Sequence, residues 1–205
     1  MAIAQRAVER DPTLVVAPPV AYGSSGEHQD FPGTLSIGQE AIELLLVELG
    51  RSALHTFALV VVVSVHGGNR APLARAVDRL ASEGRPVHGW SPTWGAGQGG
   101  DLHAGRTETS LMLAIAPERV HLERAEAGDL RPPAVLLPRL RASGVRPVSS
   151  NGVLGDPAGA DAAEGNRLLT RAAEELIGAV ERLRQASRPS VDAQGVATLG
   201  RGNLR

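Results

Sequence analysis

The chain has 205 residues, a length that fits one domain with a sizeable core, and 42% of them are hydrophobic, which argues against general disorder. A formal net charge of −1 argues against nucleic acid as the main partner, and the lack of cysteine excludes thiolate metal sites, disulfides and cysteine nucleophiles. No apolar run reaches the roughly 18 residues that span a bilayer. Since the N-terminus is also too charged for a signal peptide, we expect a cytoplasmic protein without membrane contact.

Predicted helices and strands alternate along the first half of the chain. In order, the pattern predicts a helix over 1–10, a strand over 13–20, a helix over 39–49, a strand over 57–65 and a helix over 70–84. The valine-rich run at 57–65 is typical of a central parallel strand that is covered on both faces. Ser36 and Gln39 have the spacing of a capping box, and Asn69 is placed to cap the helix that follows it.

The second half adds a short strand over 86–90 and two helices over 107–116 and 162–186. Residues 187–205 have neither apolar periodicity nor core residues, so we expect a flexible tail. Strands that alternate with helices of this length predict a single α/β domain over 1–186 with a mainly parallel sheet flanked by helices.

Gly95, Gly97 and Gly100 match the G-x-G-x-x-G pattern of dinucleotide sites. That pattern requires a strand before it and a helix that begins within it, and neither is predicted here. A nucleotide-binding domain is therefore a distant alternative, which titration with NAD or ATP would test.

Two segments bring histidine and carboxylate to places where ligands bind in α/β proteins. His66 in S-V-H-G-G-N-R follows the most apolar strand, and ligands bind at the carboxyl ends of parallel strands. The segment D-L-H-A-G-R-T-E-T-S holds Asp101, His103 and Glu108 ahead of a helix. Imidazole and carboxylate together suit Zn, Fe or Mn. The structural alternatives are a histidine bonded to backbone in a turn and a glutamate that offsets a helix dipole.

The polar run G-S-S-G-E-H-Q-D-F-P-G-T-L-S at 23–36 contains Glu27, His28 and Asp30 among glycine, serine and proline. This composition predicts a loop, which either is merely solvated or forms part of a site.

The motifs V-H-G-G-N, H-A-G-x-x-E-T-S and E-H-x-x-F-P-G-T, followed by the stretch at 151–165, resemble the creatininase family of metal-dependent amidohydrolases. The resemblance implies an α/β subunit, usually in a homohexamer, with two divalent metal ions (Fe or Zn, possibly Mn) bridged by water. It implies that His66 and Glu108 bind metal and that His103 carries a proton or binds substrate. It also implies that His28, Asn69 and Asp101 bind substrate.

Within the family, the segments at 20–34 and 151–157 are most similar to peptidases that release a C-terminal Val-Tyr-derived unit from a modified precursor peptide. That peptide is the expected substrate. One alternative is a hydrolase of creatinine, formamide or a similar amide. Another is an inactive member that serves as an oligomer subunit or binds a peptide.

The sequence departs from the family pattern at its N-terminus. Family members open with a strand and a loop resembling P-x-G-S-x-E-Q-H-G-x-H-L-P-x-x-T-D, which supplies a glutamate, a histidine and a bridging aspartate. The segment M-A-I-A-Q-R-A-V-E-R-D resembles the helix that follows this loop, so only two of about five ligands are expected here. Truncation, a misassigned start or real loss would each explain the departure. The chain as written is expected to bind metal weakly and to show little activity, and the DNA upstream of Met1 would separate the explanations.

Overall fold

The computed structural model describes residues 1–94, 101–187, 190–191 and 197–198. At its centre two parallel strands, β1 (Val60–Val63) and β2 (Val87–Trp90), pair in the register Val60 to Val87. Both strands lie within the segments predicted for them. Within the described residues, no helix is long and apolar enough to cross a membrane.

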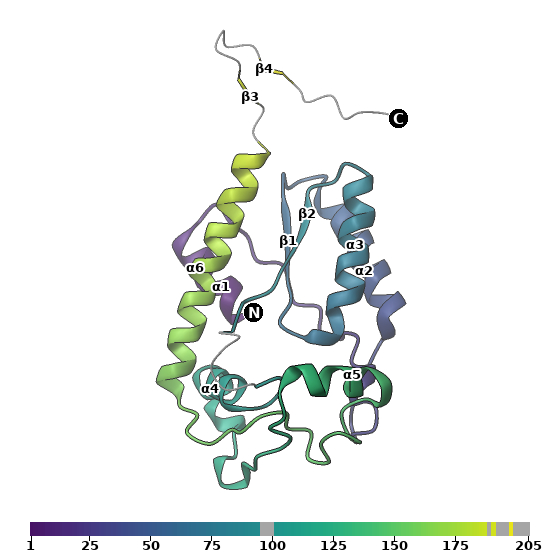
Figure 1. Cartoon of the computed structure of the whole chain (residues 1–205). Helices are drawn as coiled ribbons and strands as arrows, with labels where there is room; N and C mark the ends of the chain where they lie inside the picture. The colour runs from purple at the N-terminus through teal and green to yellow at the C-terminus, as the bar shows by residue number, and fades with distance from the viewer. Residues whose placement is uncertain (95–100, 188–189, 192–196, 199–205) are drawn as a thin grey trace.

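Helices cover both faces of this pair of strands, which confirms the predicted α/β class with a parallel sheet (Figure 1). On one side lie α1 (Ala2–Arg10) and α6 (Ala162–Ala186), and on the other lie α2 (Gly38–Ala53) and α3 (Arg70–Ser82). The helices α4 (Arg106–Ile115) and α5 (Pro133–Ser143) lie beyond one end of the strands, where α4 packs against α6.

The valines of β1 show why a continuous apolar strand suits this position. Successive side chains on a strand point to opposite faces. Val61 and Val63 pack against the core between α1 and α6, whereas Val60 and Val62 pack against the core between α2 and α3. Each face therefore needs apolar residues, and an alternating polar strand could not replace this one.

Short 3-10 helices and a pair of two-residue strands complete the described elements. The 3-10 helices are η1 (Gly26–His28), η2 (Gly67–Asn69), η3 (Pro117–Arg119) and η4 (Leu122–Arg124). In the predicted tail, β3 (Ser190–Val191) pairs antiparallel with β4 (Ala197–Thr198). The rest of that segment, like the G-x-G-x-x-G stretch at 95–100, lies outside the described residues.

The predicted strand over 13–20 is wrong. Residues 14–25 belong to the described part of the chain and form no helix or strand, and Val15 is 73% exposed. Pro18 and Pro19 lack the N–H groups that a ladder needs, so the β-branched residues beside them do not pair.

The sequence pattern also missed α5 and placed the end of α2 too early. Prolines at 132, 133 and 138 hid α5, although proline is tolerated in a first helical turn. Gly50 does not end α2, which continues to Ala53. This glycine lies against α3 and β2. A Cβ there would come within 2.8 Å of Leu80 Cδ1, so this glycine permits close packing.

Neither predicted cap forms as expected. Ser36 Oγ accepts hydrogen bonds from the N–H groups of Ser25 and Gly38, and Asn69 Oδ1 accepts from the N–H of Ser24. Asn69 makes no side-chain cap on α3, and Ser36 bonds only the N–H of Gly38, the first residue of α2, and not that of Gln39 as a capping box requires. Both instead hold the polar loop at 23–36.

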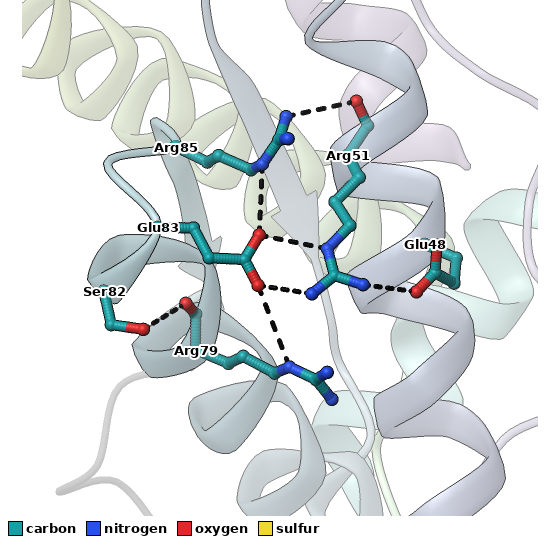
Figure 2. A network of polar contacts seen from close by, with 6 residues as sticks. All are labelled: Glu48, Arg51, Arg79, Ser82, Glu83 and Arg85. Atoms are coloured by element: carbon teal, nitrogen blue, oxygen red, sulfur yellow. Dashed lines mark hydrogen bonds and ion pairs between the residues drawn. The ribbon is translucent and has the colours of Figure 1, made fainter.

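Away from that loop, a charged network joins the ends of α2, α3 and β2 (Figure 2). Glu83 accepts hydrogen bonds from the guanidinium groups of Arg51 and Arg85, and Arg51 also pairs with Glu48. The bonds from Arg51 lower the pKa of Glu83 to about 2. The network therefore ties the turn between α3 and β2 to the last turn of α2.

Candidate active site

Three histidines from distant parts of the sequence line one cavity of about 470 Å³. His28 comes from η1 and His66 follows β1, while His103 precedes α4. The lining residues are Ser25, His28, Phe31, Thr34, Leu35, His66, His103, Ala104, Asn151 and Gly152. The polar loop at 23–36 thus forms a wall of the cavity.

His28 occupies the centre of the histidine group. Its ring centroid lies 4.7 Å from that of His103 and 6.1 Å from that of His66. Burial and the charge of His103 lower the pKa of His28, although Glu27 partly opposes them. His28 therefore favours the neutral form and can accept a proton or a hydrogen bond.

His66 contacts the polar loop through one ring nitrogen. Nε2 lies 2.9 Å from the carbonyl oxygen of Ser24 and 3.0 Å from Glu27 Oε1. Because a carbonyl oxygen can only accept, Nε2 carries the hydrogen atom in this arrangement. The carboxylate that lies against His66 is thus Glu27, a residue to which the sequence pattern assigned no role.

Gly68 allows this close approach. A Cβ at this position would lie 2.3 Å from the Ser24 carbonyl oxygen, 2.6 Å from Glu27 Oε1 and 2.7 Å from His66 Nε2. Two of the three atoms belong to the site, and the third is backbone that cannot rotate away. The second glycine of H-G-G-N is therefore needed because any side chain there would fill the space between loop and histidine.

Main-chain and side-chain hydrogen bonds fix the polar loop near its start and in its middle. The N–H of Ser24 donates to Asn69 Oδ1, and the N–H of Val145 donates to the carbonyl oxygen of Glu27. Arg146 donates to the carbonyl oxygen of Asp30 and its guanidinium lies 5.8 Å from the ring of Phe31. The predicted substrate-binding residue Asn69 is not among the residues that line the cavity; its side chain positions the loop.

His103 and Glu108 form a second polar unit at the cavity, of which His103 belongs to the lining. Nδ1 of His103 lies 3.3 Å from Glu108 Oε2, which also accepts the N–H of Ala104 at 2.7 Å. The bond from Glu108 raises the pKa of His103. Burial alone would raise the pKa of Glu108, but the bonds from His103 and Ala104 outweigh it, so that pKa is lowered. The protonated imidazole and the ionised carboxylate therefore stabilise each other.

Ala104 has a backbone conformation that is rare for a residue with a side chain. Its φ is 52°, in the left-handed region that favours glycine. The bond from its N–H to Glu108 holds this conformation, and His103 is also fixed by a β-bridge to Leu154. Strained residues of this kind occur often at functional sites, because the surrounding structure must hold them.

Asp101 has a structural position. Its Oδ2 accepts the N–H of Thr107 at 3.0 Å, at the start of α4. A Cβ on Gly105 or Gly155 would lie 2.0 or 2.1 Å from its Oδ1. The carboxylate is thus enclosed by two glycines, and it is not among the residues that line the cavity. The predicted role in substrate binding stays untested.

The described residues do not form a metal centre by themselves. The two predicted ligands each pair with a different residue: Glu108 lies against His103, and His66 lies against Glu27. Nε2 of His66 donates a hydrogen bond and has no free lone pair in this arrangement. No group of three or more histidine, aspartate or glutamate side chains in the described part of the chain could hold a metal ion.

Ser25, Asn151 and Gly152 are among the lining residues to which the sequence assigned no role. Ser25 Oγ lies 3.3 Å from His66 Nε2, and Asn151 Oδ1 accepts from Ser149 and from the N–H of Val153. Gly152 lies against Phe31. The N-G-V-L-G-D-P stretch was the available signal for Asn151 and Gly152, but only the β-bridge shows that this stretch lies beside His103.

Comparison with known proteins gives consistent sequence matches. The family model Creatininase, described as creatinine amidohydrolase, matches residues 1–180. The mycofactocin precursor peptide peptidase of Mycobacterium ulcerans (strain Agy99) is 49% identical over 177 residues, which cover 86% of this chain and 70% of that protein. The peptidase of the same name from Mycolicibacterium smegmatis (strain ATCC 700084 / mc(2)155) is 50% identical over 175 residues, covering 85% and 68%.

Solved structures with the same fold are more distant in sequence. A putative creatinine amidohydrolase from Bacteroides fragilis NCTC 9343 has a TM-score of 0.68 at 24% identity and covers 90% of this chain and 78% of that one. A structure named Creatininase Mn has a TM-score of 0.69 at 22% identity, with coverage of 88% and 80%. At these identities the matches show the shared fold.

Proposed function

The chain belongs to the creatininase family of hydrolases, and from this premise we propose that its histidine-lined cavity hydrolyses a peptide bond in a modified precursor peptide. The released product is the C-terminal Val-Tyr-derived unit. Two relatives at 49% and 50% identity, both named mycofactocin precursor peptide peptidase, support this choice of substrate.

One observation supports hydrolysis above all others: His103, which lines the cavity, pairs with the carboxylate of Glu108. A raised histidine pKa beside a half-buried carboxylate is the arrangement of a proton donor that works near neutral pH. Glu108 contacts Nδ1, so Nε2 is the nitrogen that can face a substrate. The strained backbone at Ala104 holds the two residues together.

In the proposed reaction, the oxygen of a water molecule bonds to the carbonyl carbon and the bond between that carbon and the amide nitrogen breaks. His103 delivers a proton to the departing nitrogen, which becomes the amine of the C-terminal unit. The water loses its proton to a base, for which neutral His28 at 4.7 Å from His103 is the candidate. The products are a carboxylate and an amine.

Glu27 is proposed to hold His66 in position. The Ser24 carbonyl accepts a hydrogen bond from Nε2, and the Glu27 carboxylate lies 3.0 Å from the same nitrogen. These contacts fix the ring orientation and leave Nδ1 unprotonated in the neutral imidazole. A histidine that is restrained from two sides presents its other nitrogen in a defined direction.

Metal dependence is a separate part of the proposal. A divalent ion would lower the pKa of a bound water and polarise the carbonyl group. The match to the creatininase family and the name of the structural neighbour Creatininase Mn support a divalent metal, with Fe, Zn and Mn as the ions to test. His66 and Glu108 remain the predicted metal ligands, with two ions predicted per complete site. A homohexamer and a cytoplasmic location are also still predictions.

The test is incubation of the full-length protein, including any segment encoded in frame upstream of Met1, with the modified precursor peptide and Fe(II), Zn(II) or Mn(II), followed by mass spectrometry. We expect loss of the C-terminal unit, and loss of this activity in His103→Ala. His55→Ala is the matched control, since His55 is exposed and lies outside the cavity. Hydrolysis of creatinine or a formamide without peptide cleavage would favour the amide alternative, and binding of the peptide without cleavage would favour the inactive one.

A further inference from the structure

A second cavity of about 400 Å³ adjoins the first. Ala104 and Asn151 line both cavities, so the two hollows meet at the residue that follows His103. Glu108, the partner of His103, lines the second cavity. A substrate that reacts at His103 can therefore extend into this hollow without leaving the protein surface.

Large apolar side chains remain accessible in the second cavity. Met112 on α4 is 40% exposed and Leu122 in η4 is 47% exposed, and both lie among its lining residues. Val120, Val153 and Pro157 extend this apolar wall. Exposed apolar side chains gathered at one hollow mark binding sites more often than scattered ones do.

The charged side chains of the second cavity balance each other. Its lining includes the cations Arg119 and Arg124 and the anions Glu108 and Glu126. Both arginine side chains point largely into solvent, at 77% and 78% exposed, and each has a glutamate neighbour in sequence at 3.7 or 3.9 Å. His121 also lines this cavity, and its Nδ1 lies 3.1 Å from Glu123. The arginines and glutamates of the lining thus cancel in formal charge, and the cavity is not dominated by one sign of charge.

We propose that this second cavity is the subsite for the C-terminal Val-Tyr-derived unit of the peptide substrate, an inference that rests on the proposed function. Met112 and Leu122 contact the aliphatic and aromatic parts of the unit. The volume of the cavity lies within the range of about 300–1,000 Å³ that is typical of small-molecule sites.

The direction of the peptide follows from the chemistry of the step. His103 protonates the nitrogen of the departing fragment, and in peptide hydrolysis that nitrogen belongs to the C-terminal fragment. This fragment begins beside His103 and continues past Ala104 into the second cavity. The remaining part of the peptide then lies in the first cavity, along Phe31, Thr34 and Leu35.

The chain offers a direct probe of this placement, because it has two methionines, Met1 and Met112. Methyl-labelled methionine gives one NMR signal in the second cavity and one outside its lining. The protein is titrated separately with the two reaction products, the C-terminal unit and the shortened peptide, so that no cleavage interferes. We expect the C-terminal unit to shift the Met112 signal saturably and to leave Met1 unchanged, while the shortened peptide leaves both signals near their original positions.

Leu122→Ser should weaken binding of the C-terminal unit by roughly 5- to 10-fold, since it removes an apolar contact of partly exposed area. Leu130→Ser is the matched control, because Leu130 is 64% exposed and lies outside the lining. A shift of Met112 by the shortened peptide, equal effects of the two variants, or an unshifted Met112 in a protein that cleaves the precursor would overturn the subsite. A shift of Met112 by the C-terminal unit in a protein that cleaves no peptide would overturn the proposed reaction and leave the subsite standing.

Discussion

The two walls of the cavity hold their histidines in different ways. On the wall of His66, backbone groups and Gly68 pack so closely that a single Cβ would meet three polar atoms within 2.7 Å. On the wall of His103, one carboxylate and the strained residue Ala104 hold the ring, and the pKa of His103 is raised. The first wall therefore depends on shape and the second depends on charge.

This contrast predicts which changes each wall tolerates. A change of volume should damage the wall of His66, whereas a change of charge at constant volume should damage the wall of His103. A distant charged network, the one around Glu83, supplies a third case in which charge supports the fold and not the site.

The largest effect is expected from Gly68→Ala. The new Cβ would lie 2.3 Å from the Ser24 carbonyl oxygen, so the loop or His66 must move. A displacement of this kind lowers hydrolysis by about 100-fold or more, because reacting groups lose their alignment. Overpacking also lowers the free energy of unfolding by roughly 1–3 kcal/mol, to be measured by denaturant unfolding.

Gly67→Ala is the matched control for that change. Position 67 has open space around its Cβ and no left-handed φ, so the same added methyl group meets nothing within 4 Å. Equal losses in the two variants would show that helix or turn propensity, and not the contact with Ser24, Glu27 and His66, decides the result.

Glu108→Gln is expected to have the next largest effect. The change keeps the shape of the side chain and removes the charge that raises the pKa of His103, so this pKa falls towards 6.5. Activity that needs protonated His103 falls as pH rises through the pKa of this group, so the alkaline limb of the pH–rate profile should move to lower pH. At neutral pH the rate should fall by roughly 10- to 100-fold.

Two measurements on Glu108→Gln separate its possible roles. A pH–rate profile reports the shift of the alkaline limb, and elemental analysis reports bound metal. If the variant loses metal while the pH profile keeps its position, Glu108 acts as the predicted ligand and not as the partner of His103.

Sequence reasoning located the histidines but not all of their contacts. His66 and His103 stand in motifs at the ends of predicted elements and His28 stands in the predicted polar loop, and all three line the cavity. No sequence pattern indicated a role for Glu27. Its contact is with His66, which is 39 residues away in sequence and is reached only because the polar loop folds onto the end of β1. Such a contact is a product of tertiary packing, which local pattern does not encode.

The elements themselves show the same limit. The valine run of β1 and the long apolar period of α6 predicted their structures, because burial on both faces or on one stripe leaves a strong pattern. Asn69 and Ser36 were expected to cap helices, yet the chain uses both side chains to hold the polar loop. Capping residues bond whichever N–H group the fold brings close, so their role depends on the whole structure.

Asn69→Ala tests this use of a capping residue and should have a moderate effect. The N–H of Ser24 loses its acceptor, which lowers the free energy of unfolding by about 1–2 kcal/mol if the group stays buried. Because the loop loses only one of several anchors, the hydrolysis rate should fall less than in Gly68→Ala. Asn69→Asp keeps an acceptor oxygen and should retain most of the stability; a loss equal to that of Asn69→Ala would exclude this hydrogen bond as the cause.

The smallest effect on catalysis is expected from Glu83→Gln, which lies outside the cavity. The pKa of Glu83 is about 2 in the folded protein, against an ordinary value of 4.5, because Arg51 and Arg85 bind the ionised form. The ionised group therefore stabilises the fold above pH 4.5, and this contribution disappears as pH falls towards 2. Glu83→Gln should lower the melting temperature at pH 7, keep the rate of hydrolysis, and differ less from the original protein at pH 3.

Glu48→Gln is the control, since Glu48 pairs with Arg51 but its side chain is 59% exposed, and it should change the melting temperature less. A difference in melting temperature that stays constant between pH 7 and pH 3 would show that the shape of the side chain, and not its charge, holds the turn between α3 and β2.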